Sequence, residues 1–267
     1  MKVILTGSDG FIGKRLKQKL EQVWEVVEVE QNDCWMFLDH FTEWDDVECI
    51  FHMGAISDTT ASDPVQINYY NVTFTLSLFQ IAIAKGIPVK YASSASVYGN
   101  GVSQFNPLNF YALSKLTVDY WVKDHIDEFK FVQGFRFFNV YGDGEEDKLE
   151  RNQASPVSKF IHQAVTEGKI TVFEHSDEYM RDFVCVDDVV EIVIDNDNPS
   201  GVYDLGTGMP ISFGRVAELV SKTYDVPIVE IPFPEHLHGK YQTFTCAWVT
   251  WPHKFISVKD YVENSLG

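Results

Sequence analysis

Two hydrophobic periodicities alternate along the first half of the chain. Short apolar runs with the character of buried strands occupy residues 2–7, 24–30, 47–55, 87–94 and 129–138. Segments whose apolar residues recur every three or four positions, as on one face of a helix, occupy residues 11–23, 68–86 and 111–125. Strands that alternate with helices predict a parallel sheet covered on both faces, so the expected fold class is α/β, doubly wound.

The pattern loosens after Gly142. Residues 143–153 are dense in charge and are expected to form a loop, and residues 201–208 one more strand and turn. The segment from 212 onward has a mixed pattern. We therefore expect a large sheet domain and a small C-terminal lobe, with the chain crossing between them more than once. The expected domains are residues 1–142, to which 183–205 return, and a lobe made of residues 143–182 and 206–267.

The composition narrows the class of protein. The chain has 267 residues and a formal net charge of −18 with no basic stretch, so nucleic acid is not an expected partner. No apolar run approaches the roughly 20 residues that cross a bilayer, and the N-terminus has the pattern of a strand rather than a signal peptide. We therefore expect no membrane partner and a cytoplasmic location. The four cysteines are scattered without a CxxC pair, which favours reduced thiols and no metal site.

A glycine-rich loop follows the first expected strand. Gly7, Gly10 and Gly13 are spaced three residues apart, directly after that strand and at the start of the next helix. Glycines there permit a tight turn and let the backbone approach a pyrophosphate at the positive end of the helix, as in Rossmann-type dinucleotide-binding folds. Glu30 ends the second strand about 20 residues later, where an acid binds the ribose 2′-hydroxyl. The EQND segment (30–33) has no lysine or arginine, which favours NAD over NADP.

Tyr111 and Lys115 lie four residues apart, and no other tyrosine of the twelve has a lysine at that spacing. One helical turn separates them, so they share a face of the expected helix. They are either polar residues on a helix surface or an acid/base pair. A phenol titrates at about 10, but a neighbouring ammonium stabilises the phenolate and lowers its pKa. Ser94 ends an expected strand at the edge where ligands bind in open α/β sheets, and this placement favours the acid/base interpretation.

With these motifs and others in the same order, the chain resembles the extended short-chain dehydrogenase/reductase family of nucleotide-sugar epimerases. The further matching motifs are HMGA (52–55), NVTFTLSL (71–78), SSASVYG (93–99), FRFFNVYG (135–142) and RDFVCVDDV (181–189). Within that family it is most similar to the ADP-glyceromanno-heptose 6-epimerases, on the stretches HMGAISDTT (52–60), GFRFFNVYG (134–142), VFEHSDEYMRDFV (172–184) and IPFPEHLHGKYQTFT (231–245).

The resemblance implies a Rossmann-type fold and NAD(P)-dependent epimerisation of a nucleotide sugar, with an ADP-sugar favoured. The implied reaction converts ADP-D-glycero-D-manno-heptose to ADP-L-glycero-D-manno-heptose by transient oxidation at C6 and return of the hydride. It also implies a homo-oligomer.

Residues for the cofactor are implied position by position. Phe11 and Ile12 would lie on the pyrophosphate loop, and Glu30 and Gln31 near the adenosine ribose. The residues implied to line or support the cofactor elsewhere are Met53, Gly54, Ala55, Ile56, Ser57, Asn71 and Val140, together with Tyr111 and Lys115.

The same resemblance implies the catalytic and substrate residues. Tyr111 would be the acid/base, assisted by Lys115 and Ser94. Lys148, six residues after Gly142, stands where heptose epimerases carry a second catalytic residue. The residues implied to bind the sugar nucleotide are Ser94, Asn139, Lys148, Phe173, Glu174, His175, Ser176, Arg181 and Tyr241. Arg181 suits a diphosphate because its guanidinium can bind two oxygens at once.

Some positions depart from the family pattern. Asp143 replaces a usual proline, Met53 a commoner acid and Cys185 a usual tyrosine. Relatives of this kind usually use NADP, whereas the EQND segment favours NAD. A 4-epimerase of another nucleotide sugar and a non-catalytic cofactor-binding protein are the alternatives. A 4,6-dehydratase is disfavoured, because Ala95 and Ser96 stand where that chemistry needs a carboxylic acid.

Overall fold

The computed structural model describes residues 1–58, 63–100, 104–234, 242–248 and 251–266. The chain forms two compact units. The first comprises Met1–Gly99, Phe105–Phe137 and Val190–Tyr203. The second is built mainly from Phe138–Val189 and the chain from Asp204 onward. The sheet unit therefore ends at Phe137 and resumes at Val190, whereas the sequence pattern predicts these boundaries at 142 and 183.

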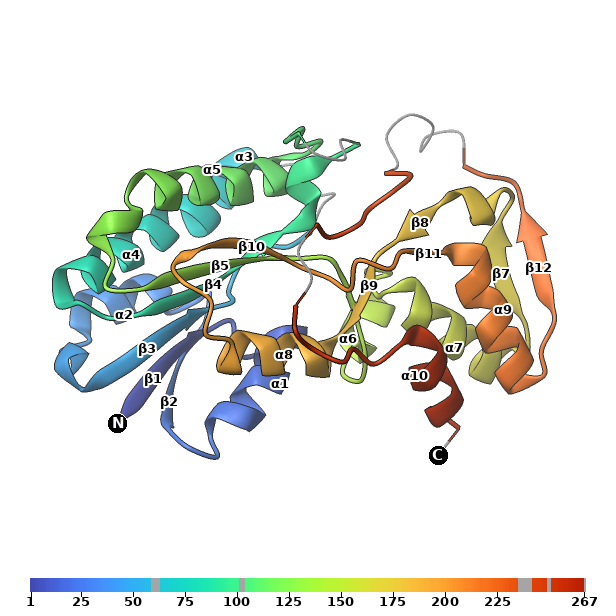
Figure 1. Cartoon of the computed structure of the whole chain (residues 1–267), viewed down its shortest axis with the longest axis horizontal. Helices are drawn as coiled ribbons and strands as arrows, with labels where there is room; N and C mark the ends of the chain where they lie inside the picture. Colours follow the sequence, from blue (N-terminus) through green and yellow to red (C-terminus); the bar gives the residue numbers. More distant parts are fainter. Residues whose placement is uncertain (59–62, 101–103, 235–241, 249–250, 267) are drawn as a thin grey trace. The chain divides into compact units, whose positions relative to one another are not determined.

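A six-stranded sheet forms the centre of the first unit, in the order β10-β5-β4-β3-β1-β2 (Figure 1). The pairings from β5 to β2 are all parallel. Its strands are β1 (Lys2–Thr6), β2 (Glu25–Val29), β3 (Val47–His52), β4 (Val89–Ser94), β5 (Val132–Phe137) and β10 (Gly201–Leu205). Strand order reverses at β1, with β2 on one side and β3 on the other. The expected doubly wound α/β fold is confirmed, and its switch point lies between β1 and β3, where such sheets bind ligands.

Helices cover both faces of this sheet (Figure 1). On one face lie α3 (Pro64–Ile67), the π-helical segment η2 (Asn68–Phe74), α4 (Thr75–Lys85) and α5 (Phe110–Asp124). On the other lie α1 (Phe11–Leu20) and the second half of α8 (Val186–Asp195). The remaining elements of this unit are α2 (Cys34–His40) and the 3-10 turns η1 (Trp44–Asp46), η3 (Ala95–Tyr98) and η4 (Ile126–Glu128).

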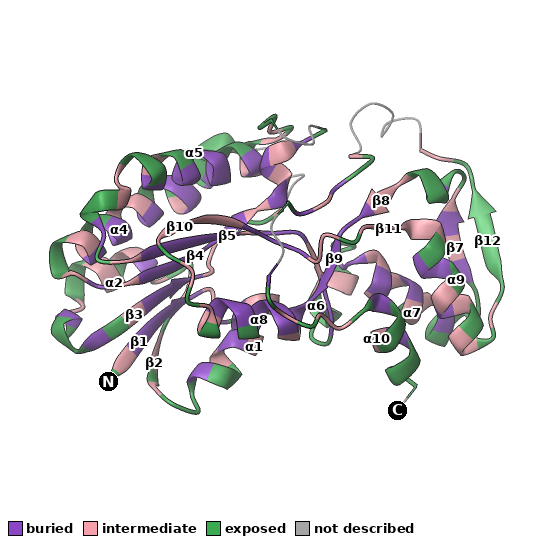
Figure 2. Ribbon diagram, in the orientation of Figure 1, coloured by how far each residue is buried: buried purple, intermediate pink, exposed green. Residues whose placement is uncertain are grey.

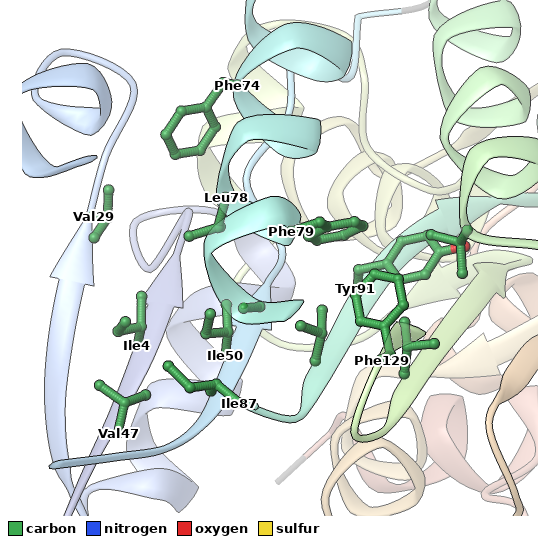
Figure 3. Packing of buried hydrophobic residues seen from close by; sticks show 14 of the residues in the cluster. Ile4, Val29, Val47, Ile50, Phe74, Leu78, Phe79, Ile87, Tyr91 and Phe129 are labelled. Atoms are coloured by element: carbon green, nitrogen blue, oxygen red, sulfur yellow. The ribbon is translucent and has the colours of Figure 1, made fainter. Parts of the chain in front are cut away.

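The core of the first unit lies between the sheet and the layer formed by η2 and α4. Phe74, Leu78 and Phe79 of that layer form one buried cluster with strand residues that include Ile4 and Ile50 (Figure 3). All five side chains are buried, and the central strands are buried along most of their length (Figure 2). Burial of each such side chain stabilises the fold by roughly 1.5–3 kcal/mol. This packing fixes the carboxyl ends of β1, β3 and β4, which carry the expected site.

The second unit pairs its strands two by two. The pairs are β6 (Asn139–Tyr141) with β9 (Phe183–Cys185), β7 (Ile170–Phe173) with β12 (Ile228–Ile231), and β8 (Met180–Arg181) with β11 (Ile211–Ser212). Its helices are α6 (Glu146–Glu150), α7 (Pro156–Glu167), α9 (Phe213–Tyr224) and α10 (Val258–Asn264), with the 3-10 turn η5 (Ser176–Glu178). A second apolar core joins α7, α9 and α10 to these strands.

Two expectations about local structure need correction. The charged segment 143–153 is not a loop throughout, because it contains α6. Glu145, just before that helix, is buried and accepts hydrogen bonds from Ser155 and Ser158, a long-range contact that the charge pattern does not reveal. The single helix expected over 68–86 begins earlier, at Pro64, and passes through the π-helical segment η2.

Candidate active site

The glycine loop forms a backbone cradle that excludes side chains. Gly7 has a left-handed φ of 70°, and a Cβ placed on it would lie 2.6 Å from the Cα of Gly54. A Cβ on Gly13 would overlap the carbonyl oxygen of Gly7. Gly10 caps α1 without a side-chain hydrogen bond, so the positive end of this ten-residue helix is offered by backbone N–H groups. Phe11 and Ile12 begin that helix. The cradle fits a dinucleotide pyrophosphate, as the spacing of the glycines predicts.

Glu30 is held beside this loop. Its carboxylate accepts hydrogen bonds from the Ser8 hydroxyl at 2.7 Å and from the Asp9 N–H at 3.0 Å. The Ser8 hydroxyl also lies 2.7 Å from Glu28, which pairs with Lys17 at 2.6 Å. Lys17 thus neutralises Glu28, a residue of β2 two positions before Glu30, and its hydrogen bond lowers the pKa of the Glu28 carboxyl. Glu30 keeps the position expected of an acid that binds a ribose hydroxyl.

Asn71 holds the segment that follows β3. Its side chain accepts the Ile56 N–H at 2.8 Å and donates to the Ile56 carbonyl oxygen at 3.0 Å. It also donates to the Ser114 hydroxyl on α5 at 3.1 Å. Met53 and Gly54 are tied to β1 through Thr6, by bonds of 3.2 and 2.9 Å. The structure therefore joins the residues expected to line the cofactor to the helix that carries Tyr111. Ser57 and Gln31 are exposed.

The structure brings Ser94, Tyr111 and Lys115 together. Tyr111 lies in the first turn of α5, and the Ser94 side chain at the end of β4 is near enough to counter part of the rise in the pKa of its phenol. Lys115 is only 5% exposed, and its ammonium donates to the Ala92 carbonyl oxygen at 2.8 Å. The Ser94 hydroxyl also accepts the Ser96 N–H at 3.2 Å. The helix-surface alternative for this pair does not hold, because Lys115 is buried against β4.

Burial sets the protonation of this group. Burial raises the pKa of the Tyr111 phenol, and the hydrogen bond from Ser94 opposes that shift. Burial lowers the pKa of Lys115 to about 8, and the negative charge of Asp119 opposes that shift. The protein alone thus keeps the phenol protonated at neutral pH. A cationic ring bound beside it would stabilise the phenolate.

Asp119 is a residue of this site that sequence reasoning missed. It lies one turn after Lys115 on α5 and is 3% exposed. Its carboxylate accepts hydrogen bonds from the hydroxyls of Tyr91 and Ser93, both at 3.0 Å. It also accepts one from Arg136 at 2.8 Å. The spacing of four from Lys115 was the signal available in the sequence.

Lys148 lies on α6 in the second unit. Its side chain is half-buried, and burial lowers the pKa of its ammonium, whereas the charge of Glu145 opposes that shift. Its backbone is fixed, because its N–H donates to the Glu145 carbonyl oxygen and its own carbonyl oxygen accepts the N–H groups of Gln153 and Ala154. Lys148 is therefore not a solvated member of a charge run.

Most of the residues expected to hold the sugar nucleotide lie in this second unit, whereas Ser94 ends β4 in the first. Asn139 and Val140 form part of β6, and the Asn139 side chain donates to the Thr245 hydroxyl at 3.1 Å. Arg181 is 5% exposed, donates to the carbonyl oxygens of Met180 and Gln242, and stacks over Phe213 at 5.3 Å. The expected residues around the end of β7 are Phe173 and Ser176, which are partly and fully buried, and Glu174 and His175, which are exposed. Tyr241 lies outside the described residues.

The sequence profile of the NAD dependent epimerase/dehydratase family matches residues 3–205, which include the cradle, the Ser94–Tyr111–Lys115 group and Lys148. The chain belongs to this family. The resemblance inferred from the motifs is thereby confirmed, and this member of the epimerase/dehydratase family is an enzyme that depends on a nicotinamide dinucleotide.

Two curated relatives are similar over most of the chain. The ADP-L-glycero-D-manno-heptose-6-epimerase of Brachyspira hyodysenteriae is 38% identical over 225 residues, 79% of this chain and 70% of the relative. That of Alkalilimnicola ehrlichii is 35% identical over 286 aligned positions, 92% of this chain and 88% of the relative. The crystal structure of Helicobacter pylori ADP-L-glycero-D-manno-heptose-6-epimerase superposes with a TM-score of 0.83 at 23% identity, over 99% of this chain and 94% of that one. That superposition supports the fold of this epimerase/dehydratase family member.

Two further properties concern the described part of this family member. None of its helices combines the length and apolarity needed to cross a bilayer. Within the same residues, no three His, Cys, Asp or Glu side chains cluster in a way that could hold a metal ion.

Proposed function

We propose that this protein is an ADP-glyceromanno-heptose 6-epimerase. It interconverts ADP-D-glycero-D-manno-heptose and ADP-L-glycero-D-manno-heptose. The similarity to the curated 6-epimerases supports the substrate, since one of them aligns with 92% of the chain. The observation that carries the chemistry is the buried ammonium of Lys115, which lies one helical turn after Tyr111 and donates to the Ala92 carbonyl oxygen, two residues before Ser94.

Most of the residues proposed to hold the dinucleotide lie in the first unit, and Val140 lies in β6 of the second. The glycine cradle binds the pyrophosphate of the dinucleotide, and Glu30 binds its adenosine ribose. The segment from Met53 to Ser57 lines the dinucleotide and is held in place by the hydrogen bonds between Asn71 and Ile56. A bound nicotinamide would supply the acceptor and donor of the hydride that this epimerisation needs. Lys115 adds a positive charge next to the phenol of Tyr111.

Tyr111 carries the proton in this scheme. As a base, its oxygen takes the proton of the substrate hydroxyl while the carbon loses a hydride. The Ser94 hydroxyl donates a hydrogen bond to the same substrate oxygen and keeps it oriented. The Lys115 ammonium stabilises the phenolate, so that the group can act near neutral pH. A positioned group of this kind contributes roughly 10²–10⁴-fold to the rate.

Lys148 is the second acid/base of the proposed reaction. C6 of a heptose lies outside the ring. Oxidation at C6 gives a carbonyl group, and this group must turn so that its opposite face receives the returning hydride. One acid/base group does not easily serve both placements, and a second titratable residue is required. A lysine whose pKa is lowered by burial is suited to this role, and Lys148 has that property. Asn139 and the residues of the second unit expected from the sequence would hold the sugar nucleotide.

NAD is the proposed dinucleotide. A 2′-phosphate would face the Glu30 carboxylate, which is already fixed by Ser8 and Asp9. Lys17, the cation of this cluster, is paired with Glu28. The homo-oligomer and the cytoplasmic location both remain predictions from the sequence.

The function is tested with the purified protein and the two 6-epimers supplied separately. Conversion of either epimer into an equilibrium mixture, followed by chromatography and proton NMR, is the expected result. UDP-glucose and UDP-galactose serve as controls for a 4-epimerase. If the protein turns over these UDP-sugars and neither heptose, it is a 4-epimerase of another nucleotide sugar. If it turns over none of the four compounds, the alternative of a non-catalytic cofactor-binding protein is favoured.

A further inference from the structure

A buried histidine connects the two strand ends at the switch point of the sheet. His52, the last residue of β3, is 2% exposed. Its Nδ1 lies 2.7 Å from the Thr6 hydroxyl at the end of β1, and its Nε2 lies 2.8 Å from the Thr75 hydroxyl at the start of α4. The rings of Phe74 and Phe79 lie on its other sides, 5.9 and 5.8 Å away. Both ring nitrogens of His52 therefore form hydrogen bonds with threonine hydroxyl groups.

The direction of each hydrogen bond in this chain can be deduced. The Thr75 hydroxyl lies 2.8 Å from the carbonyl oxygen of Asn71, which can only accept, so the single hydroxyl proton is used there. The Nε2 of His52 must then donate to the Thr75 oxygen. Burial lowers the pKa of His52 to about 3, with a smaller effect from the charge of Lys115, so the ring is neutral and its Nδ1 accepts.

The other end of the chain of bonds reaches the cofactor cradle. Because Nδ1 accepts, the Thr6 hydroxyl donates its proton to His52. The Thr6 oxygen in turn accepts the N–H of Gly54 at 2.9 Å. Gly54 is the residue whose backbone lies against Gly7. One neutral histidine tautomer thus fixes the spacing between the two backbone segments that form the cradle.

The same chain of bonds reaches the catalytic helix. Asn71, whose carbonyl oxygen ends the histidine chain, donates from its side chain to Ser114 at 3.1 Å. The Ser114 hydroxyl donates to the Tyr111 carbonyl oxygen at 2.7 Å. Asn71 lies in the π-helical segment η2, a rare geometry that is frequent at functional sites.

We propose that His52, locked as its Nε2–H tautomer, and Thr75 are positioning residues that couple the dinucleotide cradle at Gly54 to the backbone of Tyr111. The proposal rests on the proposed function only in the choice of the reaction that is assayed. Neither residue touches the reacting atoms. Each acts by holding Gly54 and Asn71, and through them the cofactor and the phenol, in one arrangement.

The test compares Thr75→Val with Thr75→Ser. Valine has a similar shape but no hydroxyl, so the Nε2–H of His52 and the Asn71 carbonyl oxygen lose their partner. We expect Thr75→Val to bind NAD more weakly and to lower kcat by roughly tenfold or more, since small misplacements of reacting groups have effects of this size. Thr75→Ser keeps the hydroxyl and should restore both. Thr117→Val, which removes an exposed hydroxyl that bonds four residues back on α5, is the matched control.

Nitrogen-15 NMR of histidine-labelled protein tests the tautomer without any sugar substrate. The His52 signals, assigned by their loss in His52→Gln, should show a protonated Nε2 and an unprotonated Nδ1, unchanged from pH 8 to pH 5. Lys115 is the charged group that acts on this ring, so the spectrum is repeated in Lys115→Met. A protonated Nδ1, or Thr75→Val with unaltered NAD affinity and kcat, would overturn the coupling. If the parent protein turns over no heptose, the NMR and calorimetric NAD titrations still decide it.

Discussion

The Nε of Arg136 donates a 2.8 Å hydrogen bond to the carboxylate of Asp119, and both side chains are largely removed from solvent. Arg136 also lies over the rings of Tyr98 and Phe105 and donates to the Tyr98 hydroxyl at 3.0 Å. Asp119 follows Lys115 by one helical turn. A single carboxylate therefore faces two buried cations, and the protonation of Lys115 depends on it.

The buried ammonium of Lys115 predicts a particular pH dependence of stability. Its pKa is about 8 in the folded protein and about 10.5 when unfolded, so between these values the unfolded chain binds more protons. The free energy of unfolding should rise with pH across this window. Lys115→Met removes that rise, so its stability relative to the parent should be greatest below pH 8. The difference in the free energy of unfolding between Lys115→Met and the parent should fall by an amount on the order of 3 kcal/mol as the pH rises from 8 to 10.5.

Urea denaturation at a series of pH values measures this difference. Lys123→Met removes an exposed lysine of the same helix and controls for the loss of a charge. A difference between Lys115→Met and the parent that stays constant with pH would show that Lys115 is not desolvated as the structure indicates. Lys115→Met should also bind the dinucleotide more weakly.

Tyr111→Phe should fold and bind NAD as the parent does but lose most of its activity. Only the phenolic hydroxyl is removed, and a positioned proton-transfer group is worth roughly 10²–10⁴-fold. Steady-state kinetics with either heptose epimer, together with calorimetric titration of NAD, measures both effects. Tyr120→Phe, an exposed tyrosine of the same helix, should be unchanged. Near-parental turnover by Tyr111→Phe would remove it from the mechanism.

NAD should bind at least as tightly as NADP, because the fixed carboxylate of Glu30 repels a 2′-phosphate. Glu30→Ala should shift the ratio of the two dissociation constants toward NADP by roughly tenfold. Glu25→Ala, at the other end of β2, is the control. Parallel calorimetric titrations decide the question. A clear NADP preference in the parent would mean that a cation such as Lys14 or Arg15 reaches the phosphate.

Lys148→Met should retain bound dinucleotide and lose most of the interconversion of the two heptose epimers, by roughly 10²-fold or more. Lys159→Met changes another lysine near Glu145, so it controls for altered charge around that carboxylate. Both variants are assayed from each epimer, beside Tyr111→Phe. Undiminished epimerisation by Lys148→Met would leave Tyr111 as the acid/base for both faces of the carbonyl.

The sequence could predict those parts of the site that depend on local spacing. The glycine loop, Glu30 and the Tyr111–Lys115 pair each follow from positions within one strand, turn or helix. Residues whose role depends on distant partners could not be identified in this way. His52 has partners 46 and 23 residues away, and Asp119 is held by Tyr91 and Arg136 from two different strands. The roles of His52 and Asp119 depend on hydrogen bonds to residues that only the folded sheet and its covering helices bring close together.

The same limit explains the errors in secondary structure. The segment around Lys148 was expected to be a loop because its residues are mostly charged. It forms α6 beside Glu145, which is 2% exposed and hydrogen-bonded to two serines at the start of α7. The π-helical turn around Asn71 lies inside residues 68–86, whose apolar spacing predicts an ordinary helix. In the structure, this turn places the Asn71 side chain where it both accepts a hydrogen bond from the Ile56 N–H and donates one to the Ile56 carbonyl oxygen.

The overlap that any Cβ at Gly13 would make with the Gly7 carbonyl has a genetic consequence. Both atoms belong to rigid backbone, one in the loop and one in α1, so neither can move aside as a flexible side chain would. Every missense change of the Gly13 codon introduces a Cβ. Only synonymous changes therefore leave the cradle intact, and natural variation in the gene should be silent at this codon as long as the enzyme is under selection.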